Sequence, residues 1–204
     1  TVNNTAAIAV AGDFTESEST DTTKLVVKDS ADGAGAAATF SGSITLDAIE
    51  VGEDDEKAGI AKFDGNVTAG VTIAGGDATE LSQAEFTANL TGATVMTEAG
   101  GTATFKTSGS TANTITGAIT TTNSKGTLVV ANTAGTTFTA GIGTDAAKLL
   151  AATVNASSVA EFQGAIAADT LTITGTATLG AATNESEVFA MGASSVLYID
   201  NTIT

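Results

Sequence analysis

Five residue types are missing from the 204-residue chain: cysteine, histidine, proline, tryptophan and arginine. Without cysteine there is no disulfide, no thiolate nucleophile and no cysteine-ligated metal. Without histidine, the most frequent general acid–base side chain near neutral pH is absent, as are Ser-His-Asp chemistry and imidazole-ligated metals. Without arginine there is no bidentate phosphate clamp. We therefore expect no catalytic residue and no cofactor-binding residue, and we predict that the protein is not an enzyme.

Positive charge is scarce. Lysine supplies all 7 positive charges against 23 aspartate and glutamate residues, which gives a net charge of −16. Because nucleic-acid affinity depends on neutralising phosphates, this balance excludes nucleic acid as a partner. An anionic membrane surface would repel the chain for the same reason. No segment approaches the roughly 18 consecutive apolar residues of a membrane span, so no span is expected.

What the chain does contain is an internal repeat of the form Phe-x-small-x-aliphatic. The copies begin at Phe40, Phe63, Phe86, Ile115, Phe138 and Phe162. Their separations are 23, 23, 29, 23 and 24 residues, as if six residues were inserted into a constant period. Phe105 is an alternative start in place of Ile115, and the total from 86 to 138 is 52 residues with either choice.

The repeat has the period of a β-strand. In the copy at Phe63, residues Ala61, Phe63, Gly65 and Val67 share one parity while polar residues occupy the other. Such alternation predicts a strand with one buried face. A unit of about 23 residues cannot bury that face alone, whereas stacked units can. We therefore predict one all-β domain over 1–204, a parallel β-solenoid, with an antiparallel β-sandwich as the alternative.

The one helix signal is the stretch DAAKLLAA at 145–152, which predicts two helical turns or, alternatively, an insertion within a coil.

The densest charge cluster is an acidic run in the first half of the chain. It comprises Glu50, Glu53, Asp54, Asp55 and Glu56. Carboxylate oxygens are ligands for Ca²⁺, so the run is a candidate calcium site. It lacks the alternating spacing of an EF-hand and the glycine-rich nonapeptide of calcium-binding β-rolls. A solvated turn is the alternative, and it is favoured.

Three further patterns suggest functions that we rank lower. Glu185 and Glu187 invite a glycosidase interpretation, but the sequence offers no supporting basic or aromatic platform. Threonines alternate over 170–178, and threonine ladders on solenoids occur in ice-binding proteins, although threonine is common on exposed strands. Five Asn-x-Ser/Thr sequons begin at Asn3, Asn66, Asn89, Asn155 and Asn184. Ten asparagines in so threonine-rich a chain yield two or three by chance.

The two ends of the chain carry β-prone apolar residues and no obvious polar cap. Segments 1–13 and 194–204 are therefore candidate pairing segments between subunits, by end-to-end stacking or strand donation. The residues concerned are Ile8, Val10, Val196, Leu197, Tyr198 and Ile199. The alternative is that each end pairs within its own chain.

The Ala-, Thr- and Gly-rich, cysteine-free, acidic repeat resembles bacterial extracellular repeat proteins of the surface-layer, adhesin and autotransporter type. The copy Phe63-Asp64-Gly65-Asn66-Val67-Thr68 carries the resemblance most clearly. The similarity, which is one of composition, covers about residues 38–180. The resemblance implies export, a structural role and calcium dependence. The chain begins at Thr1 with no charged leader, which fits a processed, secreted chain.

The functional expectation is therefore a structural subunit outside the cell or at its surface, which assembles with itself into a filament or array. An adhesin or ice-binding module is the alternative. Cell-surface polysaccharide is a further candidate partner.

Overall fold

The structure is a computed structural model that describes residues 1–3, 7–15, 22–28, 37–53, 57–75, 80–98, 102–122, 125–181 and 184–200. Regular secondary structure in these residues is entirely β-strand. None of the described residues forms a helix long and apolar enough to cross a membrane.

The strands form two sheets. The first sheet contains β1 (Val2–Asn3), β3 (Phe14–Thr15), β4 (Lys24–Lys28), β6 (Ile44–Val51), β8 (Val67–Gly75), β10 (Leu90–Thr91), β11 (Thr94–Glu98), β13 (Asn113–Ile115), β14 (Ile119–Thr121), β16 (Thr136–Phe138), β18 (Val159–Phe162), β20 (Thr176–Leu179) and β22 (Val196–Ile199). The second sheet contains β2 (Ile8–Val10), β5 (Ala38–Phe40), β7 (Ile60–Phe63), β9 (Leu81–Phe86), β12 (Thr102–Gly109), β15 (Thr127–Asn132), β17 (Leu149–Val154), β19 (Ala167–Ile173) and β21 (Glu185–Met191).

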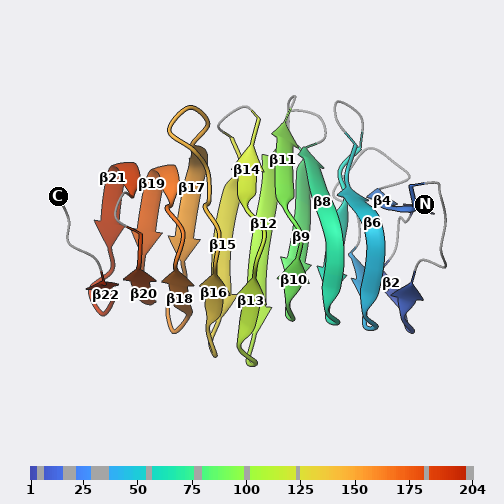
Figure 1. Ribbon diagram of the computed structural model, residues 1–204, viewed down its shortest axis with the longest axis horizontal. Helices are drawn as coiled ribbons and strands as arrows, with labels where there is room; N and C mark the ends of the chain where they lie inside the picture. Colours follow the sequence, from blue (N-terminus) through green and yellow to red (C-terminus); the bar gives the residue numbers. More distant parts are fainter. Residues whose placement is uncertain are drawn as a thin grey trace.

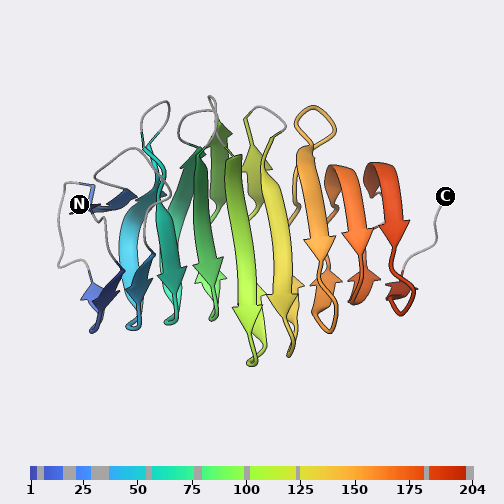
Figure 2. The same cartoon turned by 180° about the vertical axis from the view of Figure 1, so that it is seen from behind.

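The chain alternates between the two sheets, and every pairing between named strands is parallel. This arrangement is a β-solenoid of about seven turns, in which equivalent positions of successive turns are about 23 residues apart in the sequence. It confirms the predicted fold class. The antiparallel sandwich was the wrong alternative. In Figures 1 and 2 the coils succeed one another in chain order from the N-terminal to the C-terminal end. The helix considered over 145–152 is also wrong, because its last residues belong to β17.

The core consists of columns of residues that occupy the same position in successive coils. One column of the second sheet runs through Phe40, Phe63 and Phe86, all at most 1% exposed. The rings stack with centroids 5.3 and 5.1 Å apart. A second stack, Phe138 on Phe162 at 5.2 Å, lies in the first sheet. The aromatic content therefore supplies two separate stacks inside the solenoid.

This arrangement corrects the repeat register inferred from the sequence. Ile115 lies above Leu90 in the first sheet, so it does not continue the column of Phe86. Phe105 is not the equivalent position either, because it pairs with Ala84, while Thr107 pairs with Phe86. The copies at Ile115, Phe138 and Phe162 thus form a column in the other sheet. The period is real, but its phase changes at β12.

The phase changes because one corner of the coil becomes longer. The chain passes from the Phe86 column to Leu90 in four residues (86 to 90), whereas the next coil takes eight residues from Thr107 to Ile115. The additional residues include Ser110 and Thr111, which are exposed. The cross-section of the solenoid therefore widens at this point, and a step forms on its outer surface.

Candidate functional site

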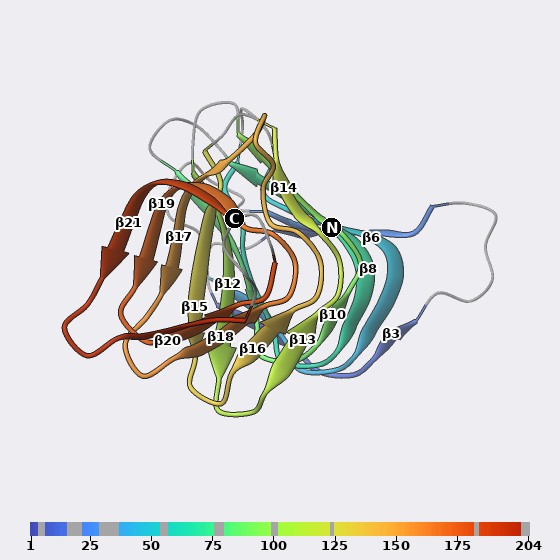
Figure 3. The ribbon, with the colours of Figure 1, turned by 60° about the vertical axis from the view of Figure 1, so that its left-hand side comes forward.

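Large exposed apolar side chains concentrate at the C-terminal edge. Nine are found among the described residues, and six of them belong to β21 and β22. These six are Val188, Phe189, Met191, Val196, Tyr198 and Ile199. Figure 3 shows β21 and β22 as the last coil at this edge. Within the described residues each of these strands pairs on one side only, β21 with β19 and β22 with β20, so backbone donors and acceptors remain on the other side.

Some of these side chains are the last members of core columns. Phe189 lies above Leu171, Met191 above Ile173, and Ile199 above Leu179, and all three lower residues are buried. Because no described coil covers them, Phe189 is 46% exposed and Met191 and Ile199 are 47% exposed. Leu197, which continues the column of Ala177, is only partly buried.

The N-terminal edge has the matching form. Ile8 and Val10 in β2 lie below Ala38 and Phe40, and Phe14 in β3 lies below Ile44. All three are half-buried, and Val10 and Phe14 pack against the core. The two edges therefore end the same columns. Ile8 and Phe189 are the two end members of one column, Val10 and Met191 of a second, and Phe14 and Ile199 of a third.

The predicted assembly residues are thus placed at the two edges of the solenoid. Ile8 and Val10 lie at one edge, and Val196, Leu197, Tyr198 and Ile199 lie at the other. Each edge strand also pairs within its own chain, as the alternative expectation had it. Residues 4–6 and 201–204 of the two predicted segments lie outside the described residues. Phe189 and Met191 lie outside the predicted segment 194–204, and no sequence signal separates them from other apolar strand residues.

Two carboxylates of the acidic run are paired with lysines. Glu50 forms an ion pair with Lys24, and Glu53 forms one with Lys28. Asp54, Asp55 and Glu56 lie outside the described residues. The described residues contain no group of three or more acidic side chains placed to hold a metal. The calcium site therefore stays a prediction that depends on the three remaining carboxylates.

The carboxylates of β21 belong to an acidic group at the C-terminal edge. A hydrogen bond with Asp145 raises the pKa of Glu185, and the neighbouring negative charge acts in the same direction. Glu187 lies 3.9 Å from the ammonium group of Lys148 and is mostly exposed. Glu185 and Glu187 thus have different partners, Asp145 and Lys148.

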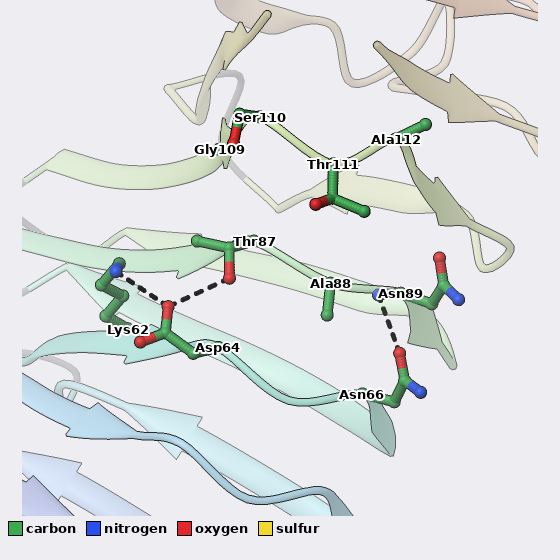
Figure 4. A pocket seen from close by; sticks show the side chains of 10 residues that line it. All are labelled: Lys62, Asp64, Asn66, Thr87, Ala88, Asn89, Gly109, Ser110, Thr111 and Ala112. Atoms are coloured by element: carbon green, nitrogen blue, oxygen red, sulfur yellow. Dashed lines mark hydrogen bonds and ion pairs between the residues drawn. The ribbon is translucent and has the colours of Figure 1, made fainter. Parts of the chain in front are cut away.

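A polar hollow of about 460 Å³ lies at the surface step beside β9 and β12, and sequence reasoning missed it. Figure 4 shows Lys62, Asp64 and Thr87 at one end, Asn66 and Asn89 at the other, and the segment 109–112 along one side. The sequence signal that could have found it is the irregular spacing before Ile115, because the corner that forms one wall takes eight residues, from Thr107 to Ile115, where the preceding coil takes four.

A column of exposed threonines runs along the first sheet. It is formed by Thr15, Thr45, Thr68, Thr91, Thr116 and Thr139, one in each of six successive coils. Each follows a large inward-facing residue, as in Asn66-Val67-Thr68 and Asn89-Leu90-Thr91. Two of the five sequons therefore arise from this coil motif.

Comparison of the chain with protein-family models, with curated proteins and with solved structures gives no match.

Proposed function

We propose that this chain is a structural subunit that assembles head to tail with further copies of itself, outside the cell or at its surface. The C-terminal edge of one copy receives the N-terminal edge of the next. What supports this proposal is the concentration of exposed apolar side chains on β21 and β22, three of which, Phe189, Met191 and Ile199, lie directly above buried core residues.

The columns fix the register of the contact. If the second copy continues each column, its Ile8 covers Phe189, its Val10 covers Met191, and its Phe14 covers Ile199. Both sheets then extend by parallel pairing, β21 with β2 and β22 with β3. Covering side chains that are about half exposed contributes roughly 1 kcal/mol each, and the new backbone ladder satisfies the open edge.

The contact is heterologous, because the two edges are different surfaces. A heterologous contact that does not close on itself produces an open filament. The net charge of −16 per copy opposes the approach of two copies. Assembly is therefore expected to strengthen with ionic strength, because salt screens this repulsion.

The test is analytical ultracentrifugation and negative-stain electron microscopy of the 204-residue chain over a range of concentrations and salt. Filaments or a concentration-dependent oligomer series are expected. Met191→Lys places a charge in the contact and is expected to leave a monomer. The matched control is Val188→Lys on the same strand, because Val188 belongs to an outward column with Thr170. It adds the same charge outside the contact and leaves assembly intact.

A mixing experiment tests the two edges separately. Val10→Lys blocks the N-terminal edge, with Ala9→Lys as its control, because Ala9 pairs with Thr39 in an outward column. Val10→Lys and Met191→Lys are each expected to be monomers, and their mixture is expected to give a dimer only. A wild-type monomer at all concentrations, or equal loss of assembly in Val188→Lys, would overturn the proposal.

The threonine column favours ice binding as a second candidate function. Successive threonines stand about 4.8 Å apart, the separation of neighbouring strands, and all six are exposed. Such a regular series of hydroxyl and methyl groups orders the adjacent water in a repeating pattern. The test is thermal hysteresis of the wild type and of Thr91→Lys, with Thr153→Lys on the second sheet as the control. Absence of hysteresis in the wild type rejects this function.

A further inference from the structure

The polar hollow at the surface step is held in shape by buried side chains. Asn113, 3% exposed, donates from Nδ2 to the carbonyl oxygens of Phe86 and Ala88, each at 3.3 Å. Asn132, fully buried, donates to the carbonyl oxygen of Thr111 at 2.9 Å and to Oδ1 of Asn113 at 3.1 Å. These bonds tie the Thr111 wall to the strand end at Ala88, so the hollow is preorganised.

The two asparagines of the hollow are oriented by the backbone. Oδ1 of Asn66 accepts a hydrogen bond from the Asn89 amide at 3.2 Å, and Oδ1 of Asn89 accepts one from the Thr114 amide at 2.8 Å. In the described residues, neither Nδ2 group donates to a protein acceptor. Because the backbone hydrogen bond to Oδ1 sets the orientation of each side-chain amide, the Nδ2 group of each asparagine points in a defined direction and is available to donate.

The other end of the hollow supplies acceptors without a net charge. Oδ1 of Asp64 receives the Thr87 hydroxyl at 3.0 Å and the Lys62 ammonium at 2.8 Å. Oδ2 of Asp64 has no protein donor among the described residues. Among the described residues that line the hollow, Lys62 and Asp64 are the only ionisable side chains, and they neutralise each other.

The lining selects one class of ligand. A free anion or cation would have to separate the Lys62–Asp64 pair, and an apolar ligand would find no large apolar side chain. The hydroxyls of Ser110 and Thr111 act as donors or acceptors, as the ligand requires. A ligand with many neutral hydroxyl groups satisfies this mixture of fixed donors and acceptors. The volume, about 460 Å³, lies within the range of small-molecule pockets.

We propose that this hollow binds a neutral saccharide, a short stretch of an uncharged glycan chain. The Nδ2 groups of Asn66 and Asn89 donate to sugar oxygens, and Oδ2 of Asp64 accepts from a sugar hydroxyl. The hollow lies away from the two edges, so this site does not depend on self-assembly. It gives the protein a polysaccharide partner in addition to further copies of itself.

The experiment is calorimetric and NMR titration of the full chain with three neutral trisaccharides, those of glucose, galactose and N-acetylglucosamine. A trisaccharide of galacturonic acid serves as the charged counterpart. Binding of at least one neutral probe is expected, with chemical-shift changes at the amides of residues 87–89 and 109–112. Failure of all neutral probes at millimolar concentration, or preference for the charged probe, overturns the proposal.

The decisive variants are Asn66→Asp and Asn89→Asp. Each keeps the oxygen that accepts the backbone hydrogen bond and replaces the Nδ2 donor with a negatively charged oxygen that can only accept, so folding is expected to be preserved. Each is expected to weaken binding about tenfold or more, because a sugar hydroxyl then faces no donor. Thr45→Asp is the matched control, because it adds the same charge at an exposed position that does not line the hollow.

Thr111→Val is the second test, because it removes a hydroxyl while leaving the carbonyl oxygen that Asn132 holds. Severalfold weaker binding with unchanged thermal unfolding supports the site. Binding that is unchanged in Asn66→Asp, Asn89→Asp and Thr111→Val rejects it.

Discussion

Phe86 and Phe105 stack with ring centroids 5.0 Å apart, although their residues are not register partners. Phe105 pairs with Ala84, and Thr107 occupies the position above Phe86. The aromatic stack is thus continued from a neighbouring column across the point where the corner of the coil lengthens. The ring of Phe105 therefore takes over the stacking contact that the next residue of the Phe86 column, Thr107, cannot make. Beyond Thr107 that column continues with the buried Val130.

Phe86→Ala is expected to be among the most destabilising substitutions in the chain. It removes a ring that contacts both Phe63 and Phe105 and leaves a cavity that stacked backbones cannot close. The expected loss is about 3–5 kcal/mol in the free energy of unfolding, measured by urea titration with circular dichroism. Phe14→Ala, at the half-buried N-terminal edge, is expected to cost clearly less. Equal losses at the two positions would contradict this account.

The fold itself could be predicted because its signal is repeated in every coil. Alternation around Phe63 and the 23-residue separation of Ala61 and Ala84 are both direct consequences of stacked parallel strands. The phase change could not be predicted, because the 52 residues from 86 to 138 fit more than one division. Only the lateral pairing of Thr107 with Phe86 resolves the division.

The sites were less accessible to sequence reasoning. The apolar residues at the chain ends predict edge contacts from the sequence, but the exposure of Phe189 and Met191 follows from their place above core columns. Asn113 and Asn132 are buried, and a pattern of apolar residues cannot predict that a polar side chain lies in the core. In the sequence Asn66 and Asn89 stand out only as sequons, because their common place at the surface step depends on the stacking of coils.

Asn113→Leu tests the buried polar group that supports the widened corner. The substitution keeps the volume but removes the hydrogen bonds that Asn113 donates to the carbonyl oxygens of Phe86 and Ala88. It also removes the bonds that Asn113 accepts from Asn132 and Thr136. The expected cost is about 2–3 kcal/mol in the free energy of unfolding, because buried polar groups then lack hydrogen bonds. Asn89→Leu, at an exposed position, is expected to cost less than 1 kcal/mol. A stabilising effect of Asn113→Leu would contradict the assigned hydrogen bonds.

Glu85 makes stability depend on acid pH. Burial acts to raise the pKa of Glu85, but hydrogen bonds from Lys106 and Ser108 and the charge of Lys106 outweigh it, so the pKa is lowered. A lowered pKa contributes stability above the ordinary glutamate value, about 4.3. That contribution is lost as pH falls through the folded-state pKa.

The measurement is the urea midpoint of the wild type and Glu85→Gln between pH 2 and 7. The wild type is expected to be the more stable at neutral pH, and the difference is expected to shrink in acid. Glu161→Gln, at an exposed carboxylate that accepts hydrogen bonds from Thr137 and Gln163, serves as the comparison. A difference that is independent of pH would show that the Lys106 and Ser108 contacts do not hold the carboxylate in its charged form.

Glu185 links pH to assembly at the C-terminal edge. Its hydrogen bond with Asp145 raises its pKa, so the folded state favours the protonated form. The stabilising effect of that proton is present below the ordinary glutamate pKa and is lost as pH rises through the raised value. The negative charge of Asp145, which contributes to the raised pKa, repels the charged form of Glu185 beside β21. Glu185→Gln is therefore expected to strengthen self-association at neutral pH and low salt, measured by sedimentation velocity. The wild type is expected to approach the variant as the pH is lowered, because Glu185 then takes up its proton. Glu161→Gln removes one charge away from β21 and controls for net charge. If both variants strengthen assembly equally, total charge alone governs the process, and the carboxyl pair has no special part in it.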